Sequence, residues 1–275
     1  MKTIYPKPLA AIAISTLVGA ASLSGATSGV VGAVNVDVPT GPTVMSFPFL
    51  QAVEFQAEVD SKSGNDLTFA DAIPVLDGPH YVHVRTGTDS GRVYMIDSYV
   101  GSTLTLVDEP TGVAAGDSVA VRPYTTLADL GTPPAFTTVT FLGDGGSPLV
   151  AFANFSGSWD VDASNTIIEP GEGMVINNNS IWSITMLGAV SEDDVIFEAS
   201  SGPQIIGNID PVDGSNDILT ALESNAPNFS TLTALAPNGA PEVYFKNFSG
   251  TWDSDPSASI DVSGLKSFIL NTSGM

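Results

Sequence analysis

The stretch NFSGSWD at residues 154–160 returns 93 residues later as NFSGTWD at residues 247–253. The copies extend further, because residues 151–180 and 244–273 share 14 identical positions in 30 when they are aligned without a gap. In each copy an apolar run meets Ser-Gly, then Trp-Asp-x-Asp, and a second apolar run follows. Glycine allows a tight turn, and a tryptophan just after it can bury ~150–250 Å² against a sheet. The repeat therefore predicts a strand–turn–strand unit, present twice, whose tryptophan fills a structural corner.

The rest of the chain also has the pattern of strands joined by turns. Short runs rich in Val, Ile, Thr, Phe and Tyr alternate with clusters of Gly, Asp, Asn, Ser and Pro. Between Thr43 and Tyr124 lie six such runs: TVMSFPF, VEFQAEVD, HYVHVRT, RVYMIDSY, STLTLV and DSVAVRPY. Their spacing predicts a small barrel or sandwich. One short helix is predicted between the repeats, capped by Asn216 or Asp217. The predicted class is therefore all-β, with a barrel- or sandwich-like N-terminal domain and a β-rich C-terminal domain that carries the repeats.

Composition changes suggest where the domains divide. Residues 125–131 predict a single helical turn that ends at glycine, and Thr-Pro-Pro at 132–134 follows it. We therefore predict an N-terminal β domain over residues 34–131 and a C-terminal β domain over residues 135–275.

Residues 1–26 have the composition of an export signal. Lys2 and Lys7 precede an almost wholly apolar run at residues 9–21, and small residues follow this run. This order is typical of a secretory signal peptide, here with cleavage after Ala26 or after Ala33. An uncleaved N-terminal anchor is the alternative. We therefore predict a protein that is secreted, periplasmic or held at the cell surface.

The overall composition excludes several classes of function. The chain carries 30 Asp+Glu against 8 Lys+Arg, a formal net charge of −22. Such a field repels phosphate backbones and anionic lipids, so nucleic acid is not a predicted partner. No segment after the signal approaches the ~20 apolar residues of a membrane span, so none is predicted in the mature chain. With no cysteine, the chain lacks disulfides and thiol chemistry.

The aspartates of the repeat suggest a cation site as one alternative to the structural corner. Asp160 and Asp162 in the first copy, and Asp253 and Asp255 in the second, occupy alternate positions, as at the start of a calcium loop. The central glycine and the final bidentate glutamate of an EF-hand loop are missing. Calcium is therefore a hypothesis at these residues, and no other cofactor is predicted.

The tryptophans suggest a second alternative. Trp159, Trp182 and Trp252 could stack on sugar rings, as in a carbohydrate-binding module. That function requires flat aromatic faces open to solvent, whereas a tryptophan in a repeated corner is more often buried. Exposure of the three indoles therefore separates the two interpretations.

The sequence does not assemble a catalytic set. Gly116-Asp117-Ser118 resembles the start of an esterase block, but a serine nucleophile needs a histidine base oriented by a carboxylate. The only histidines, His80 and His83, lie upstream on a predicted strand. We therefore predict that the protein is not an enzyme, and hydrolase action at Ser118 is the alternative.

Four motifs follow one another along the mature chain: a PF strand, a Y-V-x-(I/V) hairpin, a G-D block ending in R-P-x-x-T-L, and a P-G-E-G strand. This order resembles a family of exported, β-rich bacterial proteins of unknown function from verrucomicrobial-type genomes. The matching residues are Gly116, Asp117, Arg122, Pro123, Thr126, Leu127, Pro170, Gly171, Glu172 and Gly173. The family offers no catalytic or binding residues to carry over. Together these observations predict a structural or interaction role outside the cytoplasm, with an envelope or extracellular protein or a glycan as partner.

Overall fold

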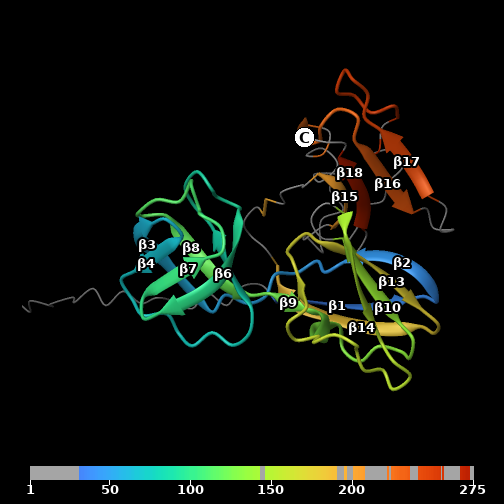
Figure 1. Cartoon of the computed structure of the whole chain (residues 1–275), viewed down its shortest axis with the longest axis horizontal. Coiled ribbons are helices and arrows are strands. Elements are labelled where there is room, and N and C mark those ends of the chain that lie inside the picture. Colours follow the sequence, from blue (N-terminus) through green and yellow to red (C-terminus); the bar gives the residue numbers. More distant parts are fainter. Residues whose placement is uncertain are drawn as a thin grey trace, which may run out of the picture.

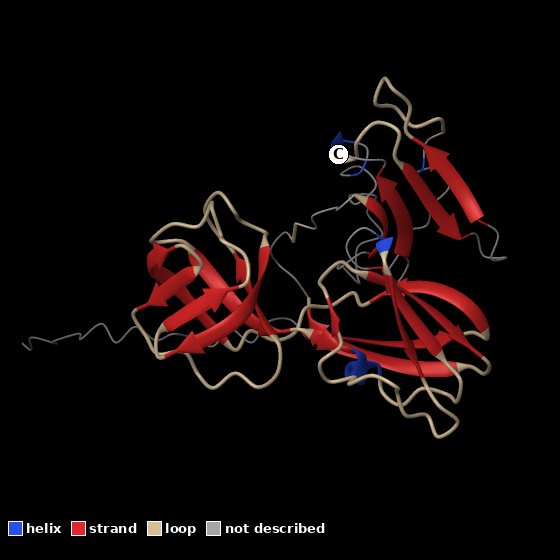
Figure 2. Cartoon of the chain, in the orientation of Figure 1, coloured by secondary structure: helices blue, strands red, loops and turns tan. Residues whose placement is uncertain are grey.

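The computed structural model describes residues 31–142, 146–190, 195–196, 201–207, 222, 224–235, 241–254, 256 and 267–272. Nearly all regular structure in these residues is strand, which confirms the predicted all-β class (Figure 2). Figure 1 shows three groups of strands: a barrel, a sandwich and a further sheet that carries the C-terminal strands. The predicted signal at residues 1–26 lies outside the described residues.

Six strands close into the barrel in the order β3, β4, β7, β6, β5 and β8. Apolar side chains fill its interior, among them Val59, Leu67, Val82, Leu104 and Val119, each no more than 1% exposed. The strands are β3 (Phe55–Ser63), β4 (Asp66–Phe69), β5 (His80–Val84), β6 (Val93–Val100), β7 (Thr103–Leu106) and β8 (Ser118–Pro123). The N-terminal barrel that the strand spacing predicts is therefore present.

The sandwich has two sheets that share one core. The larger sheet has the order β11, β10, β13, β2, and the smaller pairs β1 with β14. Met45, Phe141 and Met174 of the larger sheet lie in one buried cluster with Ile184 and Met186 of the smaller. The strands are β1 (Val31–Val38), β2 (Gly41–Ser46), β10 (Thr138–Leu142), β11 (Pro148–Phe152), β13 (Gly173–Asn178) and β14 (Trp182–Ala189). A two-residue pair, β9 (Thr125–Thr126) with β12 (Ile167–Ile168), lies where the chain enters the sandwich.

The first two strands pair differently from the expectation. The strand spacing predicts that the run TVMSFPF belongs to the barrel, but β2 pairs with β13, and β1 pairs with β14. The sixth strand of the barrel is instead β4, which follows a tight turn at Gly64. An apolar pattern identifies a strand and its buried face, but it does not identify a pairing partner far along the chain. The domain bounds, 34–131 and 135–275, stay predictions.

Helical structure is short. The turn predicted over residues 125–131 is confirmed as the 3-10 helix η1 (Leu127–Leu130), and Gly131 with φ 79° ends it. The helix predicted from Asn216 or Asp217 lies mostly outside the described residues. Leu222 belongs to a helical turn, and its carbonyl oxygen accepts a hydrogen bond from the N–H of Ala226 at 2.9 Å. Among the described residues, no helix has the length and apolar character that crossing a membrane requires.

The third group of strands repeats the larger sheet of the sandwich. Its order β17, β16, β18, β15 corresponds strand for strand to β11, β10, β13, β2. β13 and β18 even share one pattern of buried, half-buried and exposed positions. The third sheet has its own core of Ile206, Leu232, Tyr244, Phe268 and Leu270. The strands are β15 (Gly202–Gly207), β16 (Thr231–Leu235), β17 (Pro241–Phe245) and β18 (Ser267–Thr272). The duplication therefore covers a whole sheet rather than one hairpin.

The Pro-Gly-Glu-Gly turn at residues 170–173 joins the two repeated sheets. The carbonyl oxygen of Gly171 accepts a hydrogen bond from the N–H of Gly207 at 2.9 Å. A Cβ on Gly173 would lie 2.5 Å from a methyl group of β15, and a Cβ on Gly207 would lie 2.0 Å from the Cβ of Ser46. Only glycine permits backbones to approach so closely. This motif therefore holds the sheets in contact at one end.

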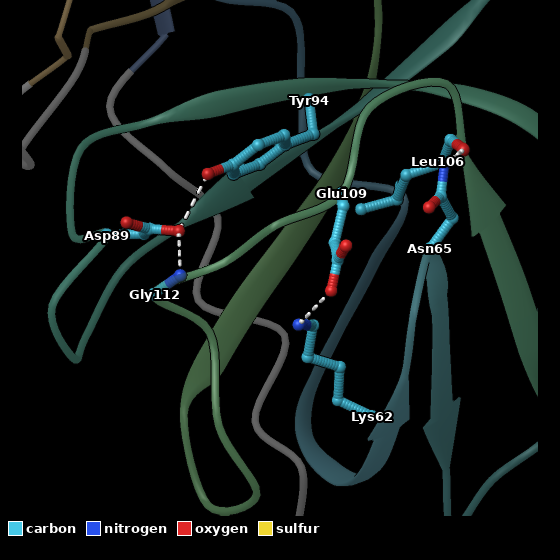
Figure 3. A network of polar contacts seen from close by, with 7 residues as sticks. All are labelled: Lys62, Asn65, Asp89, Tyr94, Leu106, Glu109 and Gly112. Atoms are coloured by element: carbon cyan, nitrogen blue, oxygen red, sulfur yellow. Dashed lines mark hydrogen bonds and ion pairs between the residues drawn. The ribbon is translucent and has the colours of Figure 1, made fainter.

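A buried carboxylate anchors the loop between β7 and β8 of the barrel (Figure 3). Asp89, 6% exposed, accepts hydrogen bonds from the Tyr94 hydroxyl at 2.6 Å and from the Gly112 N–H at 2.8 Å. Burial, together with the bond to Asp89, raises the pKa of Tyr94 to about 12. Nearby, Lys62 Nζ lies 3.1 Å from Glu109 Oε1, and Asn65 Nδ2 donates to the Leu106 carbonyl oxygen at 2.9 Å; Figure 3 includes both pairs.

Candidate interaction surface

The repeated phrase forms the same corner in both copies. In the first copy, Asn154 Oδ1 accepts hydrogen bonds from the N–H groups of Ser156 at 2.8 Å and Ser158 at 3.1 Å, and Gly157 turns with φ 78°. An asparagine side chain that bonds the backbone two residues on makes an Asx-turn, so the corner is locally determined. The second copy repeats these contacts at 2.9 and 3.2 Å with Asn247, Ser249, Gly250 (φ 82°) and Thr251.

The aspartate of each corner occupies the open edge of its sheet. β11 and β17 are edge strands, and each begins with a proline, which has no N–H. Asp160 Oδ1 accepts the N–H of Phe152 at 2.7 Å, and the Asp160 N–H donates to the Phe152 carbonyl at 2.9 Å. Asp253 binds Phe245 in the same way, at 3.0 and 2.9 Å. Free N–H and C=O groups on an edge invite another strand to pair. Each corner therefore occupies the backbone groups of one residue on β11 or β17 and hinders strand addition at that point.

The tryptophans pack against the cores, as a structural corner requires. Trp159 is half-buried against the sandwich core, with its ring centre 6.2 Å from that of Trp182. Trp252 is half-buried against the core of the third sheet, where Lys246 Nζ lies 5.9 Å from its ring centre. Trp182 is only 4% exposed. The hypothesis of sugar stacking is therefore wrong for Trp182, because a ligand cannot reach its flat face.

The remaining aspartates of the predicted calcium site also have local partners. Besides the two aspartates at the sheet edges, Asp162 accepts hydrogen bonds from the Ser164 hydroxyl at 2.6 Å and from the Asn165 amide at 2.8 Å. These bonds, that of Ser164 first, lower the pKa of the exposed Asp162 carboxyl. Asp255 lies outside the described residues. In the part of the chain that the structure describes, no group of three His, Asp or Glu could hold a metal ion. Calcium binding stays a prediction.

Both histidines lie in the wall of the barrel. His80 is 2% exposed, with Nε2 at 2.9 Å from Glu54 Oε2 and Nδ1 at 3.0 Å from a backbone carbonyl oxygen. His83 is 0% exposed. The backbone N–H of Ser118 donates to Thr86 Oγ1 at 2.7 Å. A general base must reach the proton that it abstracts from a substrate, and burial places both imidazoles away from solvent.

A small cavity lies where the barrel meets the sandwich. Its lining includes Gln51, Tyr81, Thr125 and Glu169, and it has room for about one water molecule. The hydroxyl of Tyr81, 2% exposed, has no hydrogen-bond partner there. The cavity is therefore suited to a bridging water, not to a substrate.

Exposed phenylalanines mark a different surface, which the sequence reasoning did not single out. Phe155 in the first corner is 80% exposed, and its counterpart Phe248 is 79% exposed. Phe152 and Phe245 on the edge strands are 37% and 40% exposed. Single exposed apolar residues are ordinary, but clusters of them indicate contact with another molecule.

A further phenylalanine lies beside each edge strand with an unusual backbone. Phe136 has φ 63° and Phe229 has φ 68°, and no other non-glycine residue in the described part of the chain has a positive φ. The left-handed conformation costs a residue with a Cβ ~1–2 kcal/mol. It sets each ring beside the edge strand, 6.2 Å from the ring of Phe152 in the first copy and 6.3 Å from that of Phe245 in the second. Strained residues at matched positions suggest a functional constraint on the aromatic pairs.

The outer faces of the two sheets carry the same row of side chains. In the first sheet, Phe152 pairs with Thr138, Thr138 with Asn177, and Asn177 with Pro42. Directly paired residues share a face of a sheet. We call these four the first row, and the second row has the same order: Phe245, Thr231, Asn271 and Pro203.

The rows also correct the alignment of the repeats. Without a gap, the sequences align Asn271 with Asn178, but the strand pairing makes Asn271 equivalent to Asn177. Asn177 and Asn271 are exposed, whereas Asn178 is 2% exposed. A shift of one residue moves a side chain to the opposite face of a strand. The second copy therefore carries one extra residue between its corner and its last strand.

Comparisons of the chain with protein-family models, with curated proteins and with solved structures find no match. The resemblance to exported bacterial proteins of unknown function therefore stays a prediction.

Proposed function

We propose that this chain is a non-enzymatic protein of the cell exterior, secreted, periplasmic or surface-held, that contacts a partner through its two repeated sheets. The observation that carries the proposal is the duplication of an exposed aromatic surface. Core packing accounts for the repeated tryptophans, and edge protection accounts for the repeated aspartates. Neither accounts for three pairs of equivalent exposed phenylalanines: Phe136 and Phe229, Phe152 and Phe245, Phe155 and Phe248.

The chemistry of this surface favours binding. Aromatic side chains are enriched among the residues that dominate the energy of interfaces, because they bury much area and lose little conformational entropy. Asp160 and Asp253 bind the backbone groups of Phe152 and Phe245 on the edge strands, which disfavours strand addition there and favours contact through the faces and corners. The burial of both histidines supports a role without catalysis.

A site-specific photocrosslink tests this proposal in the producing cells. A benzophenone amino acid is placed at position 155 or 248, and at position 75 as a control, because Val75 in the barrel is 89% exposed but lies outside both repeats. We expect a crosslinked product outside the cytoplasm at positions 155 and 248 and none at position 75. Absence of products at both repeat positions, or the same products at position 75, would overturn the proposal.

A further inference from the structure

The two rows indicate what kind of partner they contact. Each row places an aromatic ring, a threonine hydroxyl and an asparagine amide on neighbouring strands, and strands lie ~4.8 Å apart, so each row spans ~10–15 Å. Within the described structure, no hydrogen bond occupies the side chains of Thr138 and Asn177, or those of Thr231 and Asn271. The rows therefore offer an apolar ring beside available hydrogen-bond donors and acceptors.

This combination fits a sugar. One face of a pyranose ring consists of C–H groups, which pack against an aromatic ring, while the hydroxyls at the ring edge donate and accept hydrogen bonds. Phe152 provides the aromatic surface in the first row, and Phe136 widens it from 6.2 Å away. The amide of Asn177 both donates and accepts, so it can bind a hydroxyl in either role.

Charge narrows the choice of partner. The rows contain no ionisable side chain, while the chain as a whole carries −22. That field repels a second copy of this chain, an acidic protein and an anionic polymer alike. It does not oppose a neutral ligand, which favours an uncharged polysaccharide.

The duplication indicates a polymer rather than a small sugar. The phenylalanine and asparagine of each row are exposed, and the two sheets are in close contact at Gly173 and Gly207. A polymer repeats the same chemical group along its length, so one molecule can occupy two equivalent sites. Two linked sites raise the overall affinity by ~10²–10⁴ over one site.

We propose that the two rows bind a neutral polysaccharide, each row holding sugar units through its phenylalanine, the adjacent Phe136 or Phe229, and its asparagine amide. This inference rests on the proposed function, since it names the partner of the same surface. It moves the carbohydrate hypothesis from the tryptophans, which pack against the cores, to the exposed phenylalanines.

Binding is measured with four neutral probes and one anionic comparator. The mature chain is run in native gels that contain mixed-linkage β-glucan, dextran or alginate, and it is sedimented with cellulose and chitin. We expect retardation or co-sedimentation with at least one neutral polysaccharide and none with alginate. If the chain binds none of the four neutral probes, the inference is overturned. Equal retardation of the chain by alginate and by the neutral polysaccharides would overturn it as well.

Row variants test where the polysaccharide binds. Phe136→Asn with Phe152→Ser removes the stacked pair of rings at the first row, and Phe229→Asn with Phe245→Ser removes the pair at the second row. Asparagine tolerates positive φ and all four rings are partly exposed, so these variants should keep the fold, which circular dichroism checks. Either variant should weaken binding roughly 100-fold through loss of bivalence. Unchanged binding in a folded variant would refute the assignment to the rows.

The control pair is Val75→Ser with Val100→Ser, two barrel residues that are 89% and 82% exposed. This variant should bind as the unaltered chain does. If the crosslinks at positions 155 and 248 lead to a protein and no neutral probe binds, the interaction role stands and the polysaccharide is rejected. If neither experiment gives a product, both proposals fall.

Discussion

The side chain of Glu172 lies at the contact between the two repeated sheets. Glu172 forms a β-bridge with Ile206 of β15, and its Oε2 accepts the N–H of Glu169 at 3.0 Å. Burial raises the pKa of Glu172 from the usual 4.5 to about 7, partly opposed by the N–H of Glu169 and reinforced by the charge of Glu169. Near neutral pH this carboxyl is therefore poised between its two states.

The shift has a definite consequence for stability. The unfolded chain releases this proton near pH 4.5 and the folded chain near pH 7, so the folded state binds the extra proton between these values. The contribution of Glu172 is therefore most favourable at acid pH, and it declines as the pH rises from about 4.5 to about 7. A difference of this size corresponds to ~3 kcal/mol at pH 8. Glu172→Gln keeps a hydrogen-bond acceptor for the Glu169 N–H but cannot ionise.

Urea unfolding followed by tryptophan fluorescence measures this effect, because Trp159 and Trp182 lie in the same sandwich as Glu172. We expect Glu172→Gln to raise the free energy of unfolding by up to ~3 kcal/mol at pH 8 and to change it little at pH 4.5. Glu58→Gln, which removes the same charge from an exposed site on the barrel, is the control and should change little at either pH. A gain from Glu172→Gln that is the same at both pH values would refute the reasoning.

Three further predictions, made with four substitutions, test the corners and the barrel. Gly157→Ala should destabilise the protein more than Gly250→Ala does. Both glycines have positive φ, but a Cβ at position 157 would lie 2.7 Å from a backbone oxygen, whereas a Cβ at position 250 would lie 3.4 Å from a side-chain amide oxygen. Equal urea midpoints of the two variants would contradict this prediction. Asp160→Ala should cost ~1–3 kcal/mol and speed aggregation in light scattering, since it opens a sheet edge, and unchanged scattering would argue against edge protection. Tyr94→Phe should cost ~1–3 kcal/mol in thermal melts by removing a bond to the buried Asp89, whereas an unchanged melt would make that bond dispensable.

Local features of the fold were predictable from the sequence. Strands with one buried face show their period of two, and the helical turn at residues 127–130 ends at a glycine. The corner was also predictable, because Asn154 and Gly157 each have a conformational reason to be there. What these signals share is that they act over a few residues.

Pairing over long distances was not predictable in the same way. β2 looks like any other apolar strand, and nothing near residues 41–46 identifies β13 as its neighbour. The extra residue before β18 is similarly invisible in an ungapped alignment, because neighbouring asparagines at 177 and 178 make either register plausible. Only the partner strands decide which asparagine faces outward.

The aromatic surface, in contrast, left a signal that could have been found. PAFTTVTFL at residues 134–142 and PNFSTLTAL at 227–235 keep the same 93-residue offset as the corner. This extension places Phe136 and Phe229 within the duplicated unit. The exposure of these two phenylalanines could not be predicted, since an apolar residue in a strand-rich chain is first assigned to the core.

The divergence of the two copies argues that the exposed phenylalanines are retained for a purpose other than folding. Beside the phrase, Ala153 in the first copy has become the buried Lys246 in the second, and Leu149 corresponds to the exposed Glu242. The buried position of Ala153 and Lys246 and the exposed position of Leu149 and Glu242 have therefore each accepted a change of charge, while Phe155 and Phe248 remain phenylalanine at 80% and 79% exposure. A ring so exposed contributes little burial energy, and a polar residue there would improve solubility. Because aspartate binds the backbone of the adjacent edge residues Phe152 and Phe245, these rings can meet a partner while strand addition beside them is hindered. The corner thus hinders strand pairing at the edge of the sheet and leaves the aromatic side chains beside it accessible to a partner.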